Sequence, residues 1–128
     1  MSQLTPNELR QIGSEAFDKG CSSCRALLCN GWEAMPSTFE EASLRMVGTL
    51  RQVDPEAGEP TLDEYHPQRT SYWSENAPIA PNYFPYNRCD VWVCCGCRRA
   101  FLRYTEYGGY YVEQRIRLLD PRHVVDTA

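Results

Sequence analysis

Four cysteines in two Cys-x-x-Cys pairs are the residues whose type and spacing most clearly indicate chemistry in this chain. The pairs are Cys21 with Cys24 and Cys94 with Cys97. A Cys-x-x-Cys turn places two sulfurs on one side of a tight loop, and two such turns supply the four tetrahedral ligands of a structural zinc ion. A catalytic zinc keeps one coordination position open, whereas four cysteines close it. The spacing therefore predicts one structural zinc ion (Zn²⁺) bound by these four thiolates.

Three further cysteines and two histidines are not placed at the metal by their spacing. We interpret Cys29 and Cys89 as small buried apolar residues, and Cys95, inside the second pair, as a free thiol. The sequence leaves open whether one of these cysteines, or His66 or His123, replaces a ligand.

A dithiol redox centre is the alternative use of a Cys-x-x-Cys pair. In thioredoxin-like proteins the pair opens a helix, within a strand–helix–strand pattern. Here Cys21 follows an expected helix and Gly20, while Cys94 stands between two expected strands. Both contexts differ from the thioredoxin-like pattern, so a Cys-x-x-Cys oxidoreductase is the less favoured alternative to the metal site.

The second cysteine pair lies between two segments that read as strands. Val91 and Val93 alternate with other side chains before the pair, Gly96 suits a tight turn inside it, and Phe101 follows it. Residues 89–118 resemble the knuckle of zinc-ribbon and treble-clef domains, and this resemblance implies a structural zinc ion. Because 69 residues separate the two pairs, we expect the metal to tie an N-terminal helical part to a C-terminal hairpin. Metal binding would then be coupled to folding.

The residues after the knuckle predict a β-hairpin that carries aromatic and arginine side chains. Strand-like runs at residues 100–107 and 110–118 flank Gly108-Gly109, a strong turn signal. Tyrosine and arginine together suit a protein hot spot, and they equally suit base stacking and phosphate contact. The alternative is a hairpin with one face in the core and its arginines on the solvent face. The expected partner surface consists of Arg98, Arg103, Tyr104, Tyr107, Tyr110, Tyr111, Arg115 and Arg117.

The first cysteine pair is expected to follow a helix with clear boundary signals. Thr5 suits the N-cap, Pro6 the first helical position, and Glu8 completes a capping box. Leu9 begins an apolar face at helical spacing. Gly20 is well placed to end the helix, which would deliver the chain directly to the first pair.

A second helix is expected to begin at Ser37. Ser37 and Glu40 form another capping-box pattern. Leu44, Val47 and Leu50 then recur at an interval of three residues, which fits one face of a helix.

The remaining segments are a long connection and a short C-terminal helix. Residues 53–88 hold six of the nine prolines and show no clear periodicity. We expect an ordered loop packed on the core from about Tyr72, because disordered linkers are poor in aromatic residues. Residues 54–64 are the expected mobile segment. Asp120 and Pro121 suit the N-cap and first position of a last helix.

Composition and charge limit the classes of function. The chain has 128 residues with 42% apolar and 23% charged content, which is typical of one globular domain. Its net charge is -4 at pH 7, so nucleic-acid binding is disfavoured, although the C-terminal third is weakly basic. No apolar run suits a membrane helix or a signal peptide, and the expected location is therefore the cytoplasm.

We therefore expect a small α+β domain over residues 1–128. It would have two N-terminal helices, a long connection rich in proline and aromatic residues, and a C-terminal three-stranded antiparallel sheet with a zinc knuckle. No catalytic motif is found, and an enzyme is not expected. The expected function is protein–protein interaction, for example as an accessory or toxin-neutralising protein. Nucleic-acid binding through the hairpin and dithiol redox catalysis are the alternatives.

Overall fold

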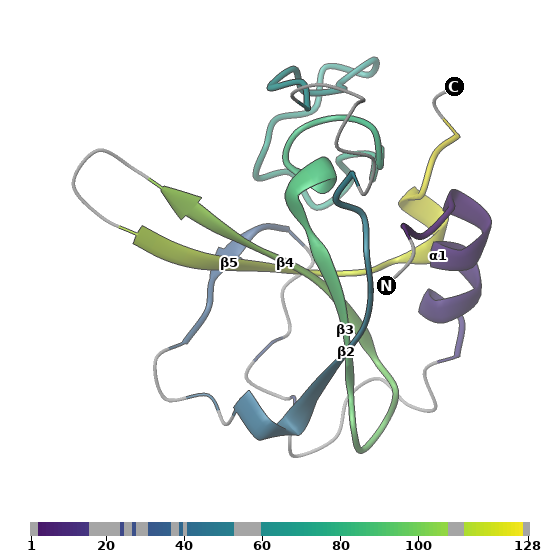
Figure 1. Ribbon diagram of the computed structural model, residues 1–128. Helices are drawn as coiled ribbons and strands as arrows, with labels where there is room; N and C mark the ends of the chain where they lie inside the picture. Colours follow the sequence, from purple (N-terminus) through teal and green to yellow (C-terminus); the bar gives the residue numbers. More distant parts are fainter. Residues whose placement is uncertain are drawn as a thin grey trace.

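An antiparallel sheet is the centre of the molecule. The computed structural model describes residues 3–15, 24, 27, 31–36, 39, 41–52, 60–107 and 112–126. Within these residues five strands pair in the order β1-β5-β4-β3-β2 (Figure 1). They are β1 (Glu33–Ala34), β2 (Leu44–Thr49), β3 (Asp90–Cys94), β4 (Ala100–Tyr107) and β5 (Val112–Leu118).

The mixed α+β class is confirmed, but the predicted three-stranded sheet is wrong. Strands β3, β4 and β5 lie where the alternation of side chains predicted them. Strands β1 and β2 extend the sheet at its two edges. A two-residue strand such as β1 is too short to show any alternation in the sequence.

The predicted second helix is the other error in the fold. Its N-cap signals, Ser37 and Glu40, lie outside the described residues. Residues 41–43 form a short 3-10 helix, η2 (Glu41–Ser43), and the chain then enters β2, which pairs with β3 from Leu44↔Cys94 to Thr49↔Asp90. The register shifts between Met46 and Gly48. Such a bulge reverses the side-chain alternation, so apolar residues at an interval of three occur in a strand.

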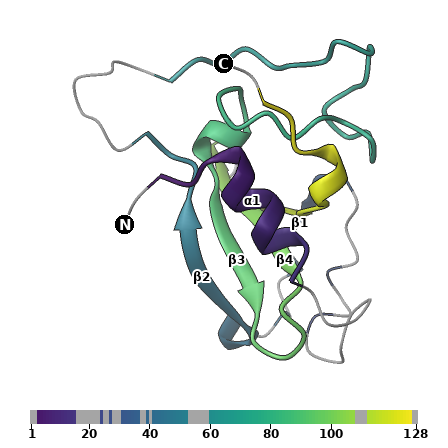
Figure 2. The same cartoon turned by 90° about the vertical axis from the view of Figure 1, so that its right-hand side faces the viewer.

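The first helix, α1 (Pro6–Gly13), begins where the sequence predicted. Glu8 N donates to Thr5 Oγ1 at 3.2 Å, and Thr5 N donates to Glu8 Oε1 at 3.0 Å, so the capping box is formed. The helix ends at Gly13, and the predicted stop at Gly20 lies outside the described residues. Leu9 is fully buried, and α1 lies across one face of the sheet (Figure 2).

Apolar side chains form two clusters, which include residues from the two faces of the sheet. On the face covered by α1, Leu9 packs with Val91, Leu102 and other buried residues. On the opposite face, Phe101 and Ile116 pack with three cysteines. Because neighbouring residues of a strand point to opposite faces, Phe101 and Leu102 belong to different clusters.

The aromatic loop expected from about Tyr72 is confirmed. The ring of Trp32 lies 6.1 Å from that of Tyr72, 5.7 Å from that of Tyr86 and 5.0 Å from that of Tyr104. The loop is thereby anchored on the α1 side of the sheet. Residues 60–64, the described part of the expected mobile segment, contain neither helix nor strand.

The C-terminal segment returns to α1. Asp120 accepts a hydrogen bond from Arg122 N at 2.9 Å and caps η5 (Pro121–His123). The predicted position is correct, and the helix is a single 3-10 turn. Among the described residues, no helix has the length and apolar character that crossing a membrane requires.

Candidate metal centre

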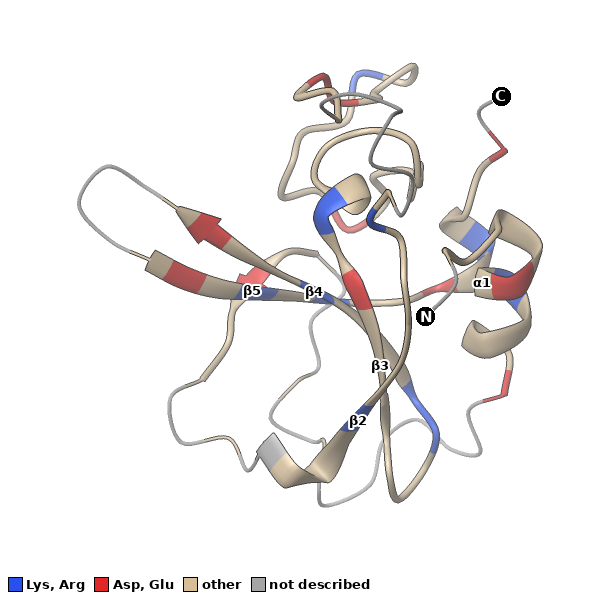
Figure 3. Ribbon diagram, in the orientation of Figure 1, with Lys and Arg blue, Asp and Glu red and all other residues tan. Residues whose placement is uncertain are grey.

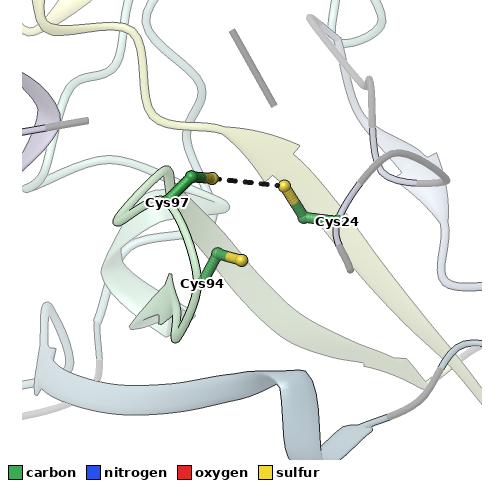
Figure 4. A group of neighbouring side chains, drawn as sticks. All are labelled: Cys24, Cys94 and Cys97. Atoms are coloured by element: carbon green, nitrogen blue, oxygen red, sulfur yellow. Dashed lines mark hydrogen bonds between the residues drawn. The ribbon is translucent and has the colours of Figure 1, made fainter. Parts of the chain in front are cut away.

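Three of the four predicted ligands lie together in the structure. The sulfurs of Cys24, Cys94 and Cys97 are all within 4.8 Å of one another (Figure 4). Cys24 Sγ and Cys97 Sγ are 3.5 Å apart. Cys24 and Cys94 are fully buried, and Cys97 is 4% exposed. Cys21 lies outside the described residues, so the structure does not place the fourth predicted ligand.

Cys94 and Cys97 are positioned by the turn that joins β3 to β4. Cys94 N donates to Arg99 O at 2.8 Å, and Arg98 N donates to Cys94 O at 3.0 Å. Arg98 has a φ of 62°, in the left-handed region that only a minority of residues adopt. The sulfurs of Cys94 and Cys97 point to the same side of the turn, toward Cys24 (Figure 4).

Cys24 comes from a segment far away in the sequence. Leu27 N donates to Cys24 O at 2.9 Å, which closes a turn directly after the cysteine. Leu27 is 1% exposed and packs in the same apolar cluster as the three cysteines. Burial of Leu27 beside Phe101 and Ile116 therefore helps hold Cys24 against the knuckle.

The spacing of the sulfurs fits a metal ion better than a disulfide. A tetrahedral zinc with Zn–S bonds of about 2.3 Å separates its sulfurs by roughly 3.8 Å. The 3.5 Å between Cys24 Sγ and Cys97 Sγ is close to that value and far from the length of about 2.05 Å of an S–S bond. None of the three cysteines forms a disulfide in the structure. The three can therefore hold one metal ion.

The other described cysteines and the two histidines do not join this group. Cys89 is fully buried in the cluster on the α1 side, as predicted, and Cys95 is exposed, as predicted. Cys29 lies outside the described residues. His66 Nε2 lies 2.8 Å from Glu64 Oε1, and His123 Nε2 lies 3.7 Å from Asp120 Oδ2. Neither histidine belongs to the thiol group among the described residues.

Burial raises the pKa of the Cys89 thiol well above its ordinary value. Desolvation is the largest cause, the charge of Asp90 adds to it, and the charge of Arg117 opposes it. The thiol donates a hydrogen bond to Pro85 O at 3.3 Å. Cys89 therefore stays a neutral thiol, which is neither a metal ligand nor a nucleophile.

Part of the predicted partner surface on the hairpin is buried, which corrects that prediction. Arg117 is 0% exposed, Tyr104 is 4% exposed and Arg103 is 9% exposed, so these three contribute little to the exposed face of the hairpin. Arg115 is half-buried, whereas Arg98 and Tyr107 are exposed. Tyr110 and Tyr111 lie outside the described residues. In Figure 3 the acidic positions of β4 and β5 lie toward the outer end of the hairpin, and the basic positions lie nearer to the rest of the sheet.

The buried arginines hold the aromatic loop against the sheet. Arg117 donates to the hydroxyl of Tyr86 from Nη1, and from Nη2 to Glu75 O at 3.1 Å and to Ala77 O at 2.8 Å. Arg115 lies over the ring of Trp73, 5.0 Å from its centre. The alternation of the strand could have indicated that Arg117 shares a face with buried residues.

Sequence reasoning also missed Leu27 and Leu44 as residues that pack beside the thiols. Leu44 was assigned to a helix face, and Leu27 has no periodic neighbours that could have marked it.

Comparison of the chain with protein families, with curated proteins and with solved structures finds no match. The function must therefore be argued from the geometry of this chain.

Proposed function

We propose that this chain is a small protein-interaction module whose fold is held by one structural zinc ion. The observation that carries the proposal is the meeting of Cys24, Cys94 and Cys97, three buried thiols from two distant segments. Cys21 is the proposed fourth ligand, because it completes the first Cys-x-x-Cys pair. This set has the all-cysteine chemistry of structural zinc sites and of zinc-ribbon knuckles.

The proposed role of the ion is to clasp the N-terminal segment to the sheet. Among the described residues, the apolar cluster around the thiols has seven buried members, three of them the cysteines themselves. A thiolate-bound ion supplies free energy of folding that such a small cluster cannot supply alone. Loss of the ion would remove the bonds that tie the Cys24 segment to the turn of Cys94 and Cys97.

Burial of the thiols favours a structural site over a redox centre. Thiol–disulfide exchange needs a thiolate that another molecule can reach. Cys24 and Cys94 are fully buried, and Cys97 is nearly so. The sulfurs of Cys24 and Cys97, which lie 3.5 Å apart, also belong to different Cys-x-x-Cys pairs. Of the five cysteines that the structure describes, Cys95 is the exposed one, and it lies outside the group.

The surface favours a protein partner over a nucleic acid. The chain carries a net charge of -4, and two of the hairpin arginines, Arg103 and Arg117, are buried. Exposed apolar side chains lie near the sheet instead, among them Tyr107 at 78% exposure and Val112 at 65%. A reducing compartment such as the cytoplasm would keep the thiols available for the ion.

Metal analysis of the purified protein tests this proposal. We expect about one zinc ion per chain, and expect cobalt exchanged into the site to give the intense near-ultraviolet absorption of thiolate-to-metal charge transfer. Cys97→Ser should lose the ion and this absorption. Cys95→Ser is the matched control, because it removes an exposed thiol from the same turn. A folded wild-type protein that contains no metal and binds no cobalt would overturn the proposal.

A further inference from the structure

A cleft of about 490 Å³ opens beside β4. Residues of the aromatic connection and of the sheet line it together. Trp92 and Thr105 belong to one face of the sheet, and Tyr104 belongs to the other. The cleft therefore lies at the edge of the sheet, where a ligand reaches both faces.

The edge of β4 beside this cleft has no neighbouring strand among the described residues. Pairing of β3 with β4 ends at Asp90↔Arg103, whereas β4 continues to Tyr107 and pairs there with β5 alone. The β4–β5 hairpin extends beyond the other strands (Figure 1). Residues 104–107 thus form an open sheet edge, and open edges can pair with an additional strand.

The backbone groups that face the cleft can be assigned from the ladder. Leu119 N donates to Ala100 O, so the backbone of Ala100 faces β5. In an antiparallel ladder successive residues direct their N–H and C=O groups to opposite sides. Thr105 and Tyr107 therefore direct theirs toward the cleft, at the spacing that an extended peptide needs.

The walls of the cleft provide apolar contacts for alternate side chains of such a peptide. Leu62 is 70% exposed and Tyr107 is 78% exposed, and both line the cleft. Phe84 and Trp92 contribute two further aromatic rings. These are four of the large apolar residues of the chain, gathered at one edge.

The end of the cleft next to β3 is basic. Arg51, Arg88 and Arg103 line the cleft, together with two carboxylates, those of Asp90 and Glu106. Arg88 is the last residue of η4 (Tyr86–Arg88), which directly precedes β3. Arg51 forms an ion pair with Asp90 at 3.0 Å. Arg88 Nη2 donates a 3.4 Å hydrogen bond to Pro60 O. No described carboxylate lies within ion-pair distance of Arg88.

We propose that this cleft binds the C-terminal end of a partner protein as an added strand, antiparallel to β4. A peptide in that orientation continues the line of β3, and its last residue lies against the start of β3. Its terminal carboxylate then meets the basic end of the cleft, where Arg88 has a guanidinium without a carboxylate partner. Arginine pairs with carboxylates through two parallel hydrogen bonds. The orientation of the peptide and the charge at this end of the cleft therefore both favour a free C-terminus as the bound group.

The other long edge of the sheet is less suited to a partner. The bulge between Met46 and Gly48 interrupts β2, and Leu4 N already donates to Thr49 O at its end. Arg45 is exposed on this strand. A bulge, a charge and a covering segment are features that protect edges from pairing.

This inference rests on the proposed role in protein interaction but not on the metal. Its test uses the zinc-loaded protein and a displayed library of random peptides with free C-termini. The selected peptides are then synthesised as free acids and as C-terminal amides, and their affinities are measured by fluorescence anisotropy. We expect the free acids to bind and the amides to bind about tenfold more weakly, because a charge-assisted pair is lost.

Two variants locate the binding to the edge and to its basic end. Thr105→Pro removes the N–H that faces the cleft and should weaken binding about tenfold, whereas Thr105→Ala keeps that N–H and should bind normally. Both variants lose the hydrogen bond from Gln114 Nε2 to Thr105 Oγ1, so they are matched. Arg88→Gln should weaken the free acids about tenfold. Arg122→Gln, an equal change of charge at an exposed site, should have no effect.

The outcomes separate this inference from the proposed function. Peptides that bind Thr105→Pro and Arg88→Gln as well as the wild type would overturn the cleft as the site and leave the interaction module standing. Equal affinity of acids and amides would overturn recognition of the C-terminus. No binding to a folded, zinc-loaded protein would overturn the inference without touching the metal site. If Thr105→Pro does not fold, as judged by circular dichroism and zinc content, the inference is tested by the affinities of Arg88→Gln and of the C-terminal amides.

Discussion

The sulfur of Cys24 lies 3.5 Å from the sulfur of Cys97, although 73 positions separate the two residues in the chain. This contact joins the segment after α1 to the turn between β3 and β4. Closing so long a loop costs conformational entropy. A metal ion shared by these thiols, as proposed above, would offset that cost at the place where the two parts of the chain meet.

Replacing one ligand should destabilise the whole domain rather than only empty a site. We expect Cys94→Ser to lose zinc and to lower the free energy of unfolding by more than about 4 kcal/mol, or to prevent folding. Urea denaturation followed by circular dichroism measures this change. Cys95→Ser should change the free energy of unfolding by less than about 0.5 kcal/mol, because its thiol is exposed. Equal stability of the two variants would contradict a structural ion.

The fourth ligand can be found by substitution of the cysteines that the structure does not describe. We expect Cys21→Ser to reduce zinc affinity strongly. Cys21 forms a Cys-x-x-Cys pair with Cys24, and a tetrahedral zinc site needs a fourth ligand. Cys29→Ser should retain the ion. Competition with a chelating dye of known zinc affinity measures both variants. If Cys29→Ser loses the ion and Cys21→Ser does not, the first pair does not supply both of its predicted ligands.

Thiol reagents should distinguish Cys89 from Cys95. Cys95 is exposed and should react with iodoacetamide at once, as followed by mass spectrometry. Cys89 should react only when the protein unfolds, because it is fully buried and its pKa is raised above its ordinary value of 9.0. A raised pKa favours the neutral thiol in the folded state, so this contribution to stability is complete below pH 9.0 and is lost as the pH rises beyond it. Rapid modification of Cys89 at neutral pH would contradict this burial.

Arg117 should be the arginine whose loss most weakens the sheet and its loop. Arg117→Met leaves Glu75 O, Ala77 O and the Tyr86 hydroxyl without their donors. We expect the free energy of unfolding to fall by about 3 kcal/mol, because buried acceptors are then unsatisfied. Arg45→Met, at an exposed position of β2, is the control and should change it by less than about 0.5 kcal/mol. A stable Arg117→Met variant would show that the loop is held by its aromatic contacts alone.

Gly31 should tolerate no larger side chain. A Cβ atom at this position would lie 2.6 Å from Trp73 O, a backbone atom that cannot move without displacing the aromatic loop. We expect Gly31→Ala to lower the free energy of unfolding by about 2 kcal/mol. At Gly13 the nearest atom to such a Cβ is Pro121 Cδ at 3.1 Å, and the helix propensity of alanine offsets about 1 kcal/mol. Thermal melts of the two variants should therefore differ, with Gly31→Ala the less stable.

Much of the local structure could be predicted from the residues themselves. The capping box of α1, the strands β3, β4 and β5 and the cap of η5 depend on neighbours within a few positions. Local signals fix such elements because the interacting groups are close in sequence. The Cys-x-x-Cys pattern likewise indicated which cysteines to consider as ligands.

The incorrect predictions from the sequence have a common physical cause. The apolar residues Leu44, Val47 and Leu50 matched a helix, but pairing with β3 and a bulge made the segment a strand. Long-range pairing overrides local periodicity when the segment completes a sheet. Arg117 and Tyr104 were expected at a surface, but the connection before β3 covers them.

The sequence by itself determined the chemical types at the metal centre, since thiols at x-x spacing can bind a soft ion wherever they lie. Only the tertiary structure decided that Cys24 meets Cys94 and Cys97, because packing of Leu27, Phe101 and Ile116 brings the two segments together. Tertiary structure alone also decided that β3 begins opposite Arg103, whereas β4 continues to Tyr107. The open edge and its cleft follow from that difference in strand length, which no local pattern encodes.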